Sequence, residues 1–158
     1  MTAPLQSLAD RFAFNDRFLD MLTDGFDDRD WLRRGGPGNH AQWILGHLAS
    51  TRRWALREFG QPAEEQPWEQ DFGMGRTPTP QSDDIDPAQL REAFLKNGAA
   101  LRAFLAGVTP ERATAGFKSF PDGSNTVAGA AHFLHFHETY HLGQIGLLRR
   151  MAGKKGVV

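Results

Sequence analysis

The chain has 158 residues, of which 40% are hydrophobic and 23% charged, a composition typical of one globular domain spanning residues 1–158. Its 18 Lys and Arg residues against 19 Asp and Glu give a net charge of −1. This balance excludes an overall positive potential that would attract nucleic acid or an anionic membrane. The sequence has no cysteine, which excludes disulfides, thiolate metal ligands and a thiol nucleophile.

No apolar run is long enough to span a bilayer, and residues 1–5 lack the basic region and apolar block of a signal peptide. We therefore expect a soluble cytoplasmic protein with neither a membrane nor a nucleic-acid partner.

Two amphipathic helices are predicted in the first part of the chain. The first covers residues 5–22, because its apolar residues recur at the helical period, and Asn15 falls on the same stripe. The second covers residues 39–59. Asn39 can cap it after a Gly-Gly-Pro-Gly turn, and Gly60 ends it.

Two further helices are predicted in the second part. Asp86 followed by proline marks the start of a helix that breaks at Gly107. The last helix begins between residues 124 and 126 and runs to Met151. No segment alternates with period two, so the sequence predicts an all-α, four-helix bundle.

The connection between the second and third helices, residues 61–85, is unusually long. It contains four prolines, but Trp68, Phe72 and Met74 argue against disorder. We expect it to form a lid or wall over one end of the bundle, and we expect residues 152–158 to be a frayed tail.

The last helix carries two histidines on its apolar stripe. His137 and His141 stand one turn apart, in line with Leu134, Ile145 and Leu148. Two buried imidazoles without partners would cost about 1–3 kcal/mol each. A shared metal ion is one partner for both, and separate hydrogen bonds to carbonyls or carboxylates are the alternative.

His47 strengthens the metal hypothesis, because it lies on the corresponding stripe of the second predicted helix, between Trp43 and Thr51. Three inward histidines from two helices can bind one divalent ion, with zinc or nickel preferred and iron also suitable, and leave positions open for water or substrate. His132 and His135 point elsewhere on the last helix and are predicted to be surface or interface residues.

Residues 137–141 also match H-E-x-x-H, the zinc-protease pattern in which the glutamate is the general base. Such proteases take a third ligand from downstream. No Asp, Glu or His follows His141, so the protease hypothesis fails. His40, a heptad before His47, could reach only the rim of the site.

Two stretches of the chain resemble the DinB-like proteins of the DinB/YfiT superfamily. Residues 39–49, ending in Gly-His-Leu-Ala, are similar to the second-helix signature of that family. Residues 132–145, with His-x-x-x-His followed by Gly-Gln, and then Leu148-Arg149-Arg150, are similar to its last-helix block.

The resemblance implies an up-down-down-up bundle, commonly a homodimer, with a metal held by His47, His137 and His141. Characterised relatives include thiol-dependent S-transferases and a maleylpyruvate isomerase, but family membership does not fix the small-molecule substrate. A metal at such a site can activate a bound water, giving hydrolysis, or an external thiol, giving thiol transfer.

Two residues beside the histidines are candidate catalytic groups. Glu138 is either a proton shuttle or a solvent-facing residue, and Gln144 either hydrogen-bonds a ligand or water or packs between helices. Trp43, Trp54, Trp68 and Phe72 are pocket-lining candidates or core residues. The competing class is a non-catalytic metal-binding, stress-response or helical interaction protein.

Overall fold

Four long helices build the protein in the computed structural model, which describes residues 3–158. They are α1 (Gln6–Thr23), α3 (Ala41–Glu58), α5 (Pro87–Gly107) and α7 (Val127–Met151). The short elements between them are α2 (Asp28–Leu32), the 3₁₀ turn η1 (Glu69–Phe72), α4 (Pro80–Asp83) and α6 (Pro110–Thr114). The prediction of an all-α, four-helix bundle is confirmed.

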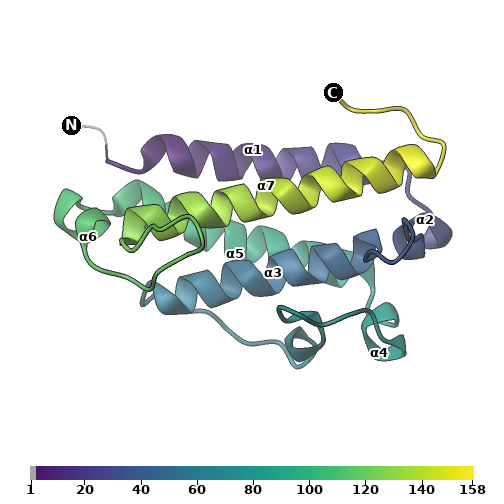
Figure 1. Ribbon diagram of the computed structural model, residues 1–158, viewed down its shortest axis with the longest axis horizontal. Coiled ribbons are helices and arrows are strands. Elements are labelled where there is room, and N and C mark those ends of the chain that lie inside the picture. Colours follow the sequence, from purple (N-terminus) through teal and green to yellow (C-terminus); the bar gives the residue numbers. More distant parts are fainter. Residues whose placement is uncertain (1–2) are drawn as a thin grey trace.

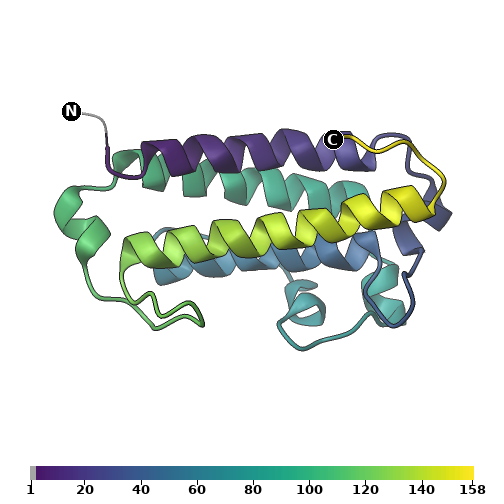
Figure 2. The ribbon, with the colours of Figure 1, turned by 45° about the horizontal axis from the view of Figure 1, so that its top comes forward.

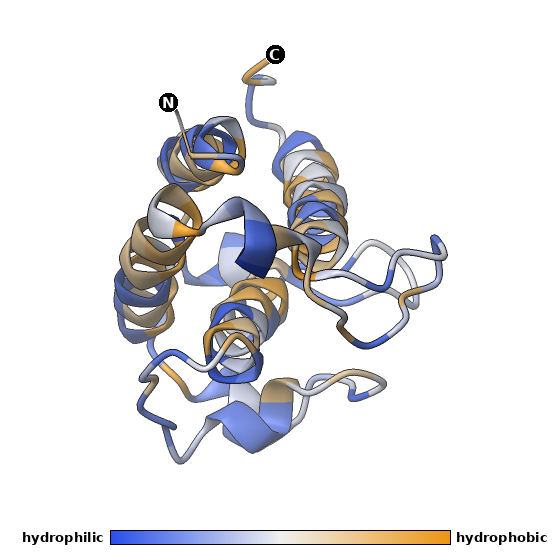
Figure 3. Cartoon of the chain, turned by 90° about the vertical axis from the view of Figure 1, so that its left-hand side faces the viewer, coloured by the Kyte–Doolittle hydropathy of each residue, from blue (hydrophilic) through white to orange (hydrophobic). Residues whose placement is uncertain are grey.

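The long helices follow an up-down-down-up order. Helices α1 and α7 run in one direction and α3 and α5 in the other (Figure 1). Helix α1 packs against α5 and α7, and α3 packs against the same two helices. Viewed along the bundle axis, the long helices surround one interior (Figure 3). Because α3 and α5 are parallel, the chain between them must return along the whole bundle.

Side-chain caps fix where the helices begin. Asp86 Oδ1 accepts from the Ala88 amide at 2.8 Å, as the sequence predicted. Thr126, the last residue of the predicted starting range, caps α7, because its Oγ1 accepts from the Gly129 amide at 3.1 Å. The predicted cap of the second long helix is wrong by one residue. His40, not Asn39, caps α3, because its unprotonated Nδ1 accepts from the Trp43 amide at 3.1 Å.

The segment 61–85 is a wall along the side of α3 rather than a lid over one end of the bundle. It runs beneath α3 from one end of the molecule to α4 at the other (Figure 1). Three carbonyl oxygens of residues 82, 83 and 85 accept from Gln42 Nε2, and His40 Nε2 lies 2.8 Å from Asp83 Oδ1. These contacts hold the end of the segment against the start of α3, and Arg53 pairs with Glu69 further along the helix.

The apolar core is divided into two clusters along the bundle. One contains Phe12 and Leu134, and the other contains Leu19 and Leu142. Between these positions α1, α3 and α7 each bring polar residues inward, so a polar layer separates the two halves of the core. The members of this layer that are buried are Asn15, Asp16, Arg52 and Glu138.

The prediction of a frayed tail needs correction. The chain after α7 turns back toward α1 (Figure 2). Lys154 Nζ lies 3.1 Å from Asp30 Oδ2, Arg149 Nε donates to the Lys155 carbonyl at 2.7 Å, and Val157 packs on the core. Throughout residues 3–158, no helix combines the length and apolar character that crossing a bilayer requires.

Candidate metal centre

Helices α3 and α7 bring the three predicted histidines together. His47 comes from the middle of α3, and His137 and His141 come from successive turns of α7. His137 Nε2 lies 3.2 Å from His47 Nε2 and 3.2 Å from His141 Nε2. In the described part of the chain these residues form the group whose donor atoms all lie within 4.8 Å of one another.

The outer nitrogens of two of these rings are held by protein acceptors. His47 Nδ1 lies 2.8 Å from the Phe72 carbonyl oxygen, and His141 Nδ1 lies 2.7 Å from Gln144 Oε1. A carbonyl oxygen only accepts, so His47 carries its proton on Nδ1 and leaves an unprotonated lone pair on Nε2. The same tautomer follows for His141 when Gln144 is oriented with its amide oxygen toward the ring.

The spacing of the inner nitrogens fits a divalent cation. Ligands at roughly 2.0–2.1 Å from zinc, with bond angles of about 90–110°, lie roughly 2.9–3.4 Å apart. The two distances of 3.2 Å fall within this range. A proton on His137 Nε2 would point at only one of the two neighbouring lone pairs, whereas a cation satisfies all three nitrogens.

Burial keeps these imidazoles neutral. Desolvation lowers the pKa of His47 and His141, and desolvation together with the two neighbouring rings lowers the pKa of His137 to about 4. Neutral imidazole is the form that binds a metal. Near neutral pH the cluster is therefore ready to coordinate without losing protons from its inner nitrogens.

A glycine admits the side chain that supports His47. A Cβ atom built on Gly46 would lie 2.3 Å from the Phe72 ring, so only glycine lets this ring reach α3. Phe72 is fully buried, and its carbonyl is the acceptor for His47. Trp43 stacks on His47 with ring centroids 5.2 Å apart and an interplanar angle of 8°. The wall segment therefore sets the orientation of a candidate ligand.

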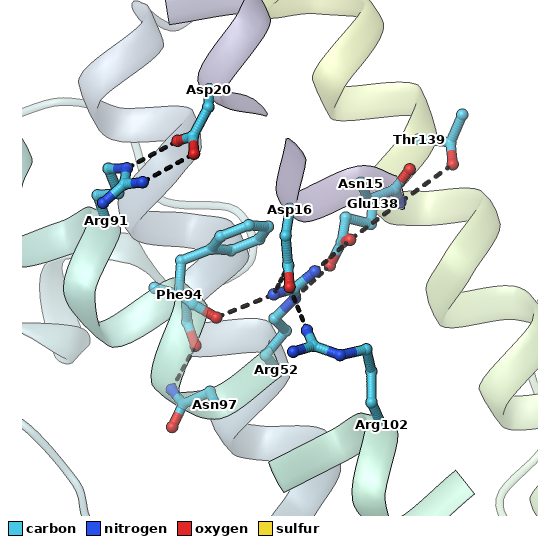
Figure 4. Close-up of polar contacts among 11 residues, drawn as sticks. Asn15, Asp16, Asp20, Arg52, Arg91, Phe94, Asn97, Arg102, Glu138 and Thr139 are labelled. Carbon is cyan, nitrogen blue, oxygen red and sulfur yellow. Dashed lines mark hydrogen bonds and ion pairs between the residues drawn. The ribbon is translucent and has the colours of Figure 1, made fainter. Parts of the chain in front are cut away.

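Glu138 does not face solvent, which corrects one of the two alternatives for this residue. It is 3% exposed, and Arg52 binds it through Nε to Oε2 and Nη2 to Oε1, both at 2.7 Å. Asn15 Nδ2 also donates to Oε1 at 3.0 Å (Figure 4). The carboxylate is engaged by three donors in the core, and its role as a proton shuttle stays a prediction that this geometry does not favour.

Arg52 is a central residue that the sequence analysis missed. Its Nη1 donates to Asp16 Oδ1 at 2.7 Å and to the Phe94 carbonyl at 2.9 Å, and Arg102 pairs with the same aspartate (Figure 4). Burial alone would lower the pKa of Arg52, but the paired carboxylates Glu138 and Asp16 outweigh it and raise the pKa. The available signal was an arginine between Leu48 and Ala55 on an apolar stripe.

Gln144 has a defined contact at the site. Its Oε1 is the partner of His141, and its Nε2 donates to Tyr140 Oη at 3.3 Å. It therefore orients a candidate ligand instead of packing between helices. The phenol accepts from Gln144, so the Tyr140 proton is left free to donate toward a bound molecule.

The remaining histidines lie outside the cluster. His40 is fully buried as the α3 cap and does not reach the rim of the site. His132 is exposed, and His135 is half-buried with its ring edge-on to Phe12 at 5.3 Å. Of the aromatic candidates, Trp43 and Phe72 adjoin His47, and Trp68 packs edge-on against Phe72 in the wall segment at 5.6 Å.

Comparisons with known proteins agree with this architecture. The family model of the DinB superfamily matches residues 12–145. YfiT from Bacillus subtilis has a TM-score of 0.72 at 19% identity, and the match covers 94% of this chain and 87% of the YfiT chain. YfiT is described as a probable metal-dependent hydrolase with an unusual four-helix bundle topology. A DinB-like protein from Bacillus cereus has a TM-score of 0.71 at 17% identity, and the match covers 100% of this chain and 99% of the Bacillus cereus chain. No curated protein matches the sequence.

Proposed function

Because this chain belongs to the DinB superfamily, we propose that it is a metal-dependent enzyme in which His47, His137 and His141 hold one divalent ion. The proposed ion is zinc or nickel, with iron as the third candidate, since neutral imidazoles suit all three. The proposed substrate is a small molecule, and the reaction is hydrolysis or transfer from an external thiol.

One observation carries this proposal. The inner nitrogen of His137 lies within hydrogen-bond distance of those of His47 and His141, while the outer nitrogens of His47 and His141 are already committed to acceptors. Satisfied core histidines would each have a separate partner, and this arrangement leaves the inner lone pairs facing one another. Three protein ligands are typical of a catalytic site with an open position, whereas structural sites use four.

A divalent ion at this position would lower the pKa of a water or thiol that shares its coordination sphere. The chain itself supplies no thiol, so sulfur chemistry requires an external one. Gln144 fixes the ring of His141, and Tyr140 presents a hydroxyl proton beside it. These two residues are the proposed contacts for orienting a substrate.

Metal content of the purified protein tests the proposal. The protein should be prepared without a metal-affinity tag and examined by elemental analysis beside His47→Ala, His137→Ala and His141→Ala. We expect roughly one ion per wild-type chain and none in the three variants. His132→Ala is the matched control, because His132 is an exposed histidine on the same helix. An empty wild-type protein after supplementation with zinc, nickel and iron would leave a non-catalytic helical interaction module.

Cobalt substitution separates the two candidate nucleophiles. A small thiol added to the cobalt-loaded protein produces a sulfur-to-metal charge-transfer band only if it binds the ion as a thiolate. This band, absent in His141→Ala, would favour thiol transfer. A spectrum unchanged at high thiol concentration would favour water, and ester and amide substrates should then be screened.

A homodimer is proposed on the outward face of α7. Phe136, Tyr140, Leu147 and Met151 follow one another at helical spacing and are all exposed. Such a stripe is typical of an interaction surface. Light scattering should give twice the chain mass for the wild-type protein and the single mass for Leu147→Glu. A monomeric wild-type protein would contradict the dimer and leave the metal centre untouched.

A further inference from the structure

His137 differs from the other two histidines of the cluster in its outer nitrogen. His47 Nδ1 and His141 Nδ1 each face an acceptor, but no atom of residues 3–158 forms a hydrogen bond with His137 Nδ1, although this atom is buried. An unpaired buried donor costs about 1–3 kcal/mol. Metal-binding histidines almost always donate from the outer nitrogen to a carboxylate, carbonyl or water.

A small cavity adjoins the His137 side chain. It lies among the four long helices, measures about 10 Å³, and is lined by the polar residues Thr51, Arg52, His137 and Glu138 together with apolar core residues. This volume meets the lower limit for a single water, which needs roughly 10–15 Å³ and two to four polar partners.

Two acceptors on the cavity wall have free capacity. Among the described residues, Glu138 Oε2 accepts from Arg52 Nε alone, whereas Oε1 accepts from both Arg52 and Asn15. Thr51 Oγ1 donates its proton to the His47 carbonyl at 2.8 Å, so its lone pairs remain available. A water accepting from His137 Nδ1 would thus find two acceptors for its own protons.

We propose that one buried water in this cavity links His137 Nδ1–H to the Glu138 carboxylate, and that Glu138 is a positioning residue for the metal ligand. The inference rests on the metal centre proposed above. It assigns the glutamate of the H-E-x-x-H string a role opposite to that in a protease. Glu138 acts from the core side of His137 and does not touch the reacting atoms.

The Arg52 pair explains why Glu138 can hold this position. A carboxylate with two charge-assisted bonds from one guanidinium is fixed in orientation. The guanidinium is fixed in turn by Asp16 and by the Phe94 carbonyl. The water therefore connects His137 to a rigid, internally neutralised network, and the network determines the ring orientation.

Zinc affinity, measured by competition with a chromophoric chelator, tests the link. Glu138→Gln should weaken zinc binding by roughly 10–100-fold, the usual effect of removing an outer-shell partner. Asp20→Asn is the matched control, because it neutralises a carboxylate that pairs with the exposed Arg91 and contacts neither Arg52 nor Glu138. It should bind zinc as the wild type does. Equal losses in both variants, or no loss in Glu138→Gln, would overturn the proposal.

A high-resolution crystal structure of the wild-type protein tests the water directly, with or without zinc, and does not depend on a variant that folds. Electron density for one water between His137 Nδ1 and Glu138 would support the link, and an empty cavity would overturn it. A wild-type protein that binds no zinc but holds this water would contradict the proposed function alone.

Discussion

Two polar clusters lie side by side in the interior, and they differ in how their hydrogen bonds are completed. Arg52, Glu138 and Asp16 form ion pairs with one another, and the positive and negative groups are neutralised by protein atoms alone. His47, His137 and His141 turn three lone pairs toward one point and have no cation of their own among the described residues.

The difference distinguishes buried polar groups that stabilise the fold from buried polar groups that are available to bind a ligand. A network that satisfies itself can act as structure. A cluster that leaves its lone pairs unsatisfied requires a cation or a hydrogen-bond donor from outside the chain. The two clusters meet at neighbouring residues of α7, His137 and Glu138, which point to different sides of the helix, so the fold rigidly supports the candidate site.

The largest expected effect comes from breaking the self-satisfied network. Arg52→Met leaves Glu138 and part of Asp16 buried without a cation, which should lower the free energy of unfolding by about 3–5 kcal/mol. Denaturant titration measures it. The control is Arg91→Met, which removes an exposed pair with Asp20 and should cost about 0–1 kcal/mol. Equal losses in both variants would contradict a structural role for the buried network.

The histidine cluster should respond to metal instead. Zinc at a free concentration of about 1,000 times its dissociation constant should stabilise the wild-type protein by about 4 kcal/mol. His141→Ala should gain little at the same concentration, because one of three ligands is gone. Thermal unfolding with and without zinc measures the difference. A similar gain in both proteins would place the ion elsewhere.

The contact between the wall segment and α3 should give an intermediate effect. Gly46→Ala forces the Phe72 ring away from α3 and should cost about 1–3 kcal/mol, with weaker zinc binding because the acceptor of His47 moves. Gly143→Ala on α7 is the control. Its Cβ meets no atom within 4 Å, so it should stabilise the helix by about 0.5–1 kcal/mol. Unchanged zinc affinity in Gly46→Ala would show that the Phe72 carbonyl is not needed.

The smallest expected effect, counted per pH unit, is the pH dependence of the stability of the metal-free protein. The pKa of His137 is about 4 in the folded state against an ordinary value of 6.5. Between these values the unfolded chain binds more protons, so stability should fall as the pH falls from 6.5 toward 4 and be insensitive to this group above 6.5. The slope for one histidine is at most about 1.4 kcal/mol per pH unit. His137→Asn should flatten it, and an equal slope in that variant would assign the dependence to other groups.

Much of the fold could be predicted from local patterns. The cap at Asp86, the glycine breaks and the helical stripes placed all four long helices closely, because capping and periodicity are local properties. The short helices α2, α4 and α6 were not predicted, since four or five residues carry no measurable periodicity. The lid and the frayed tail were wrong because long-range contacts hold both segments.

The sequence by itself determined that His47, His137 and His141 face inward, because residues one turn apart share a helix face. Only the tertiary structure decided what lies opposite them. Arg52 pairs with Glu138, which is 86 positions away in the sequence, and Phe72 of the wall segment packs against Gly46 of α3. Such pairings depend on which helices are neighbours and on how closely their backbones approach. The same helix therefore carries a candidate metal ligand at one residue and a structural ion pair at the next.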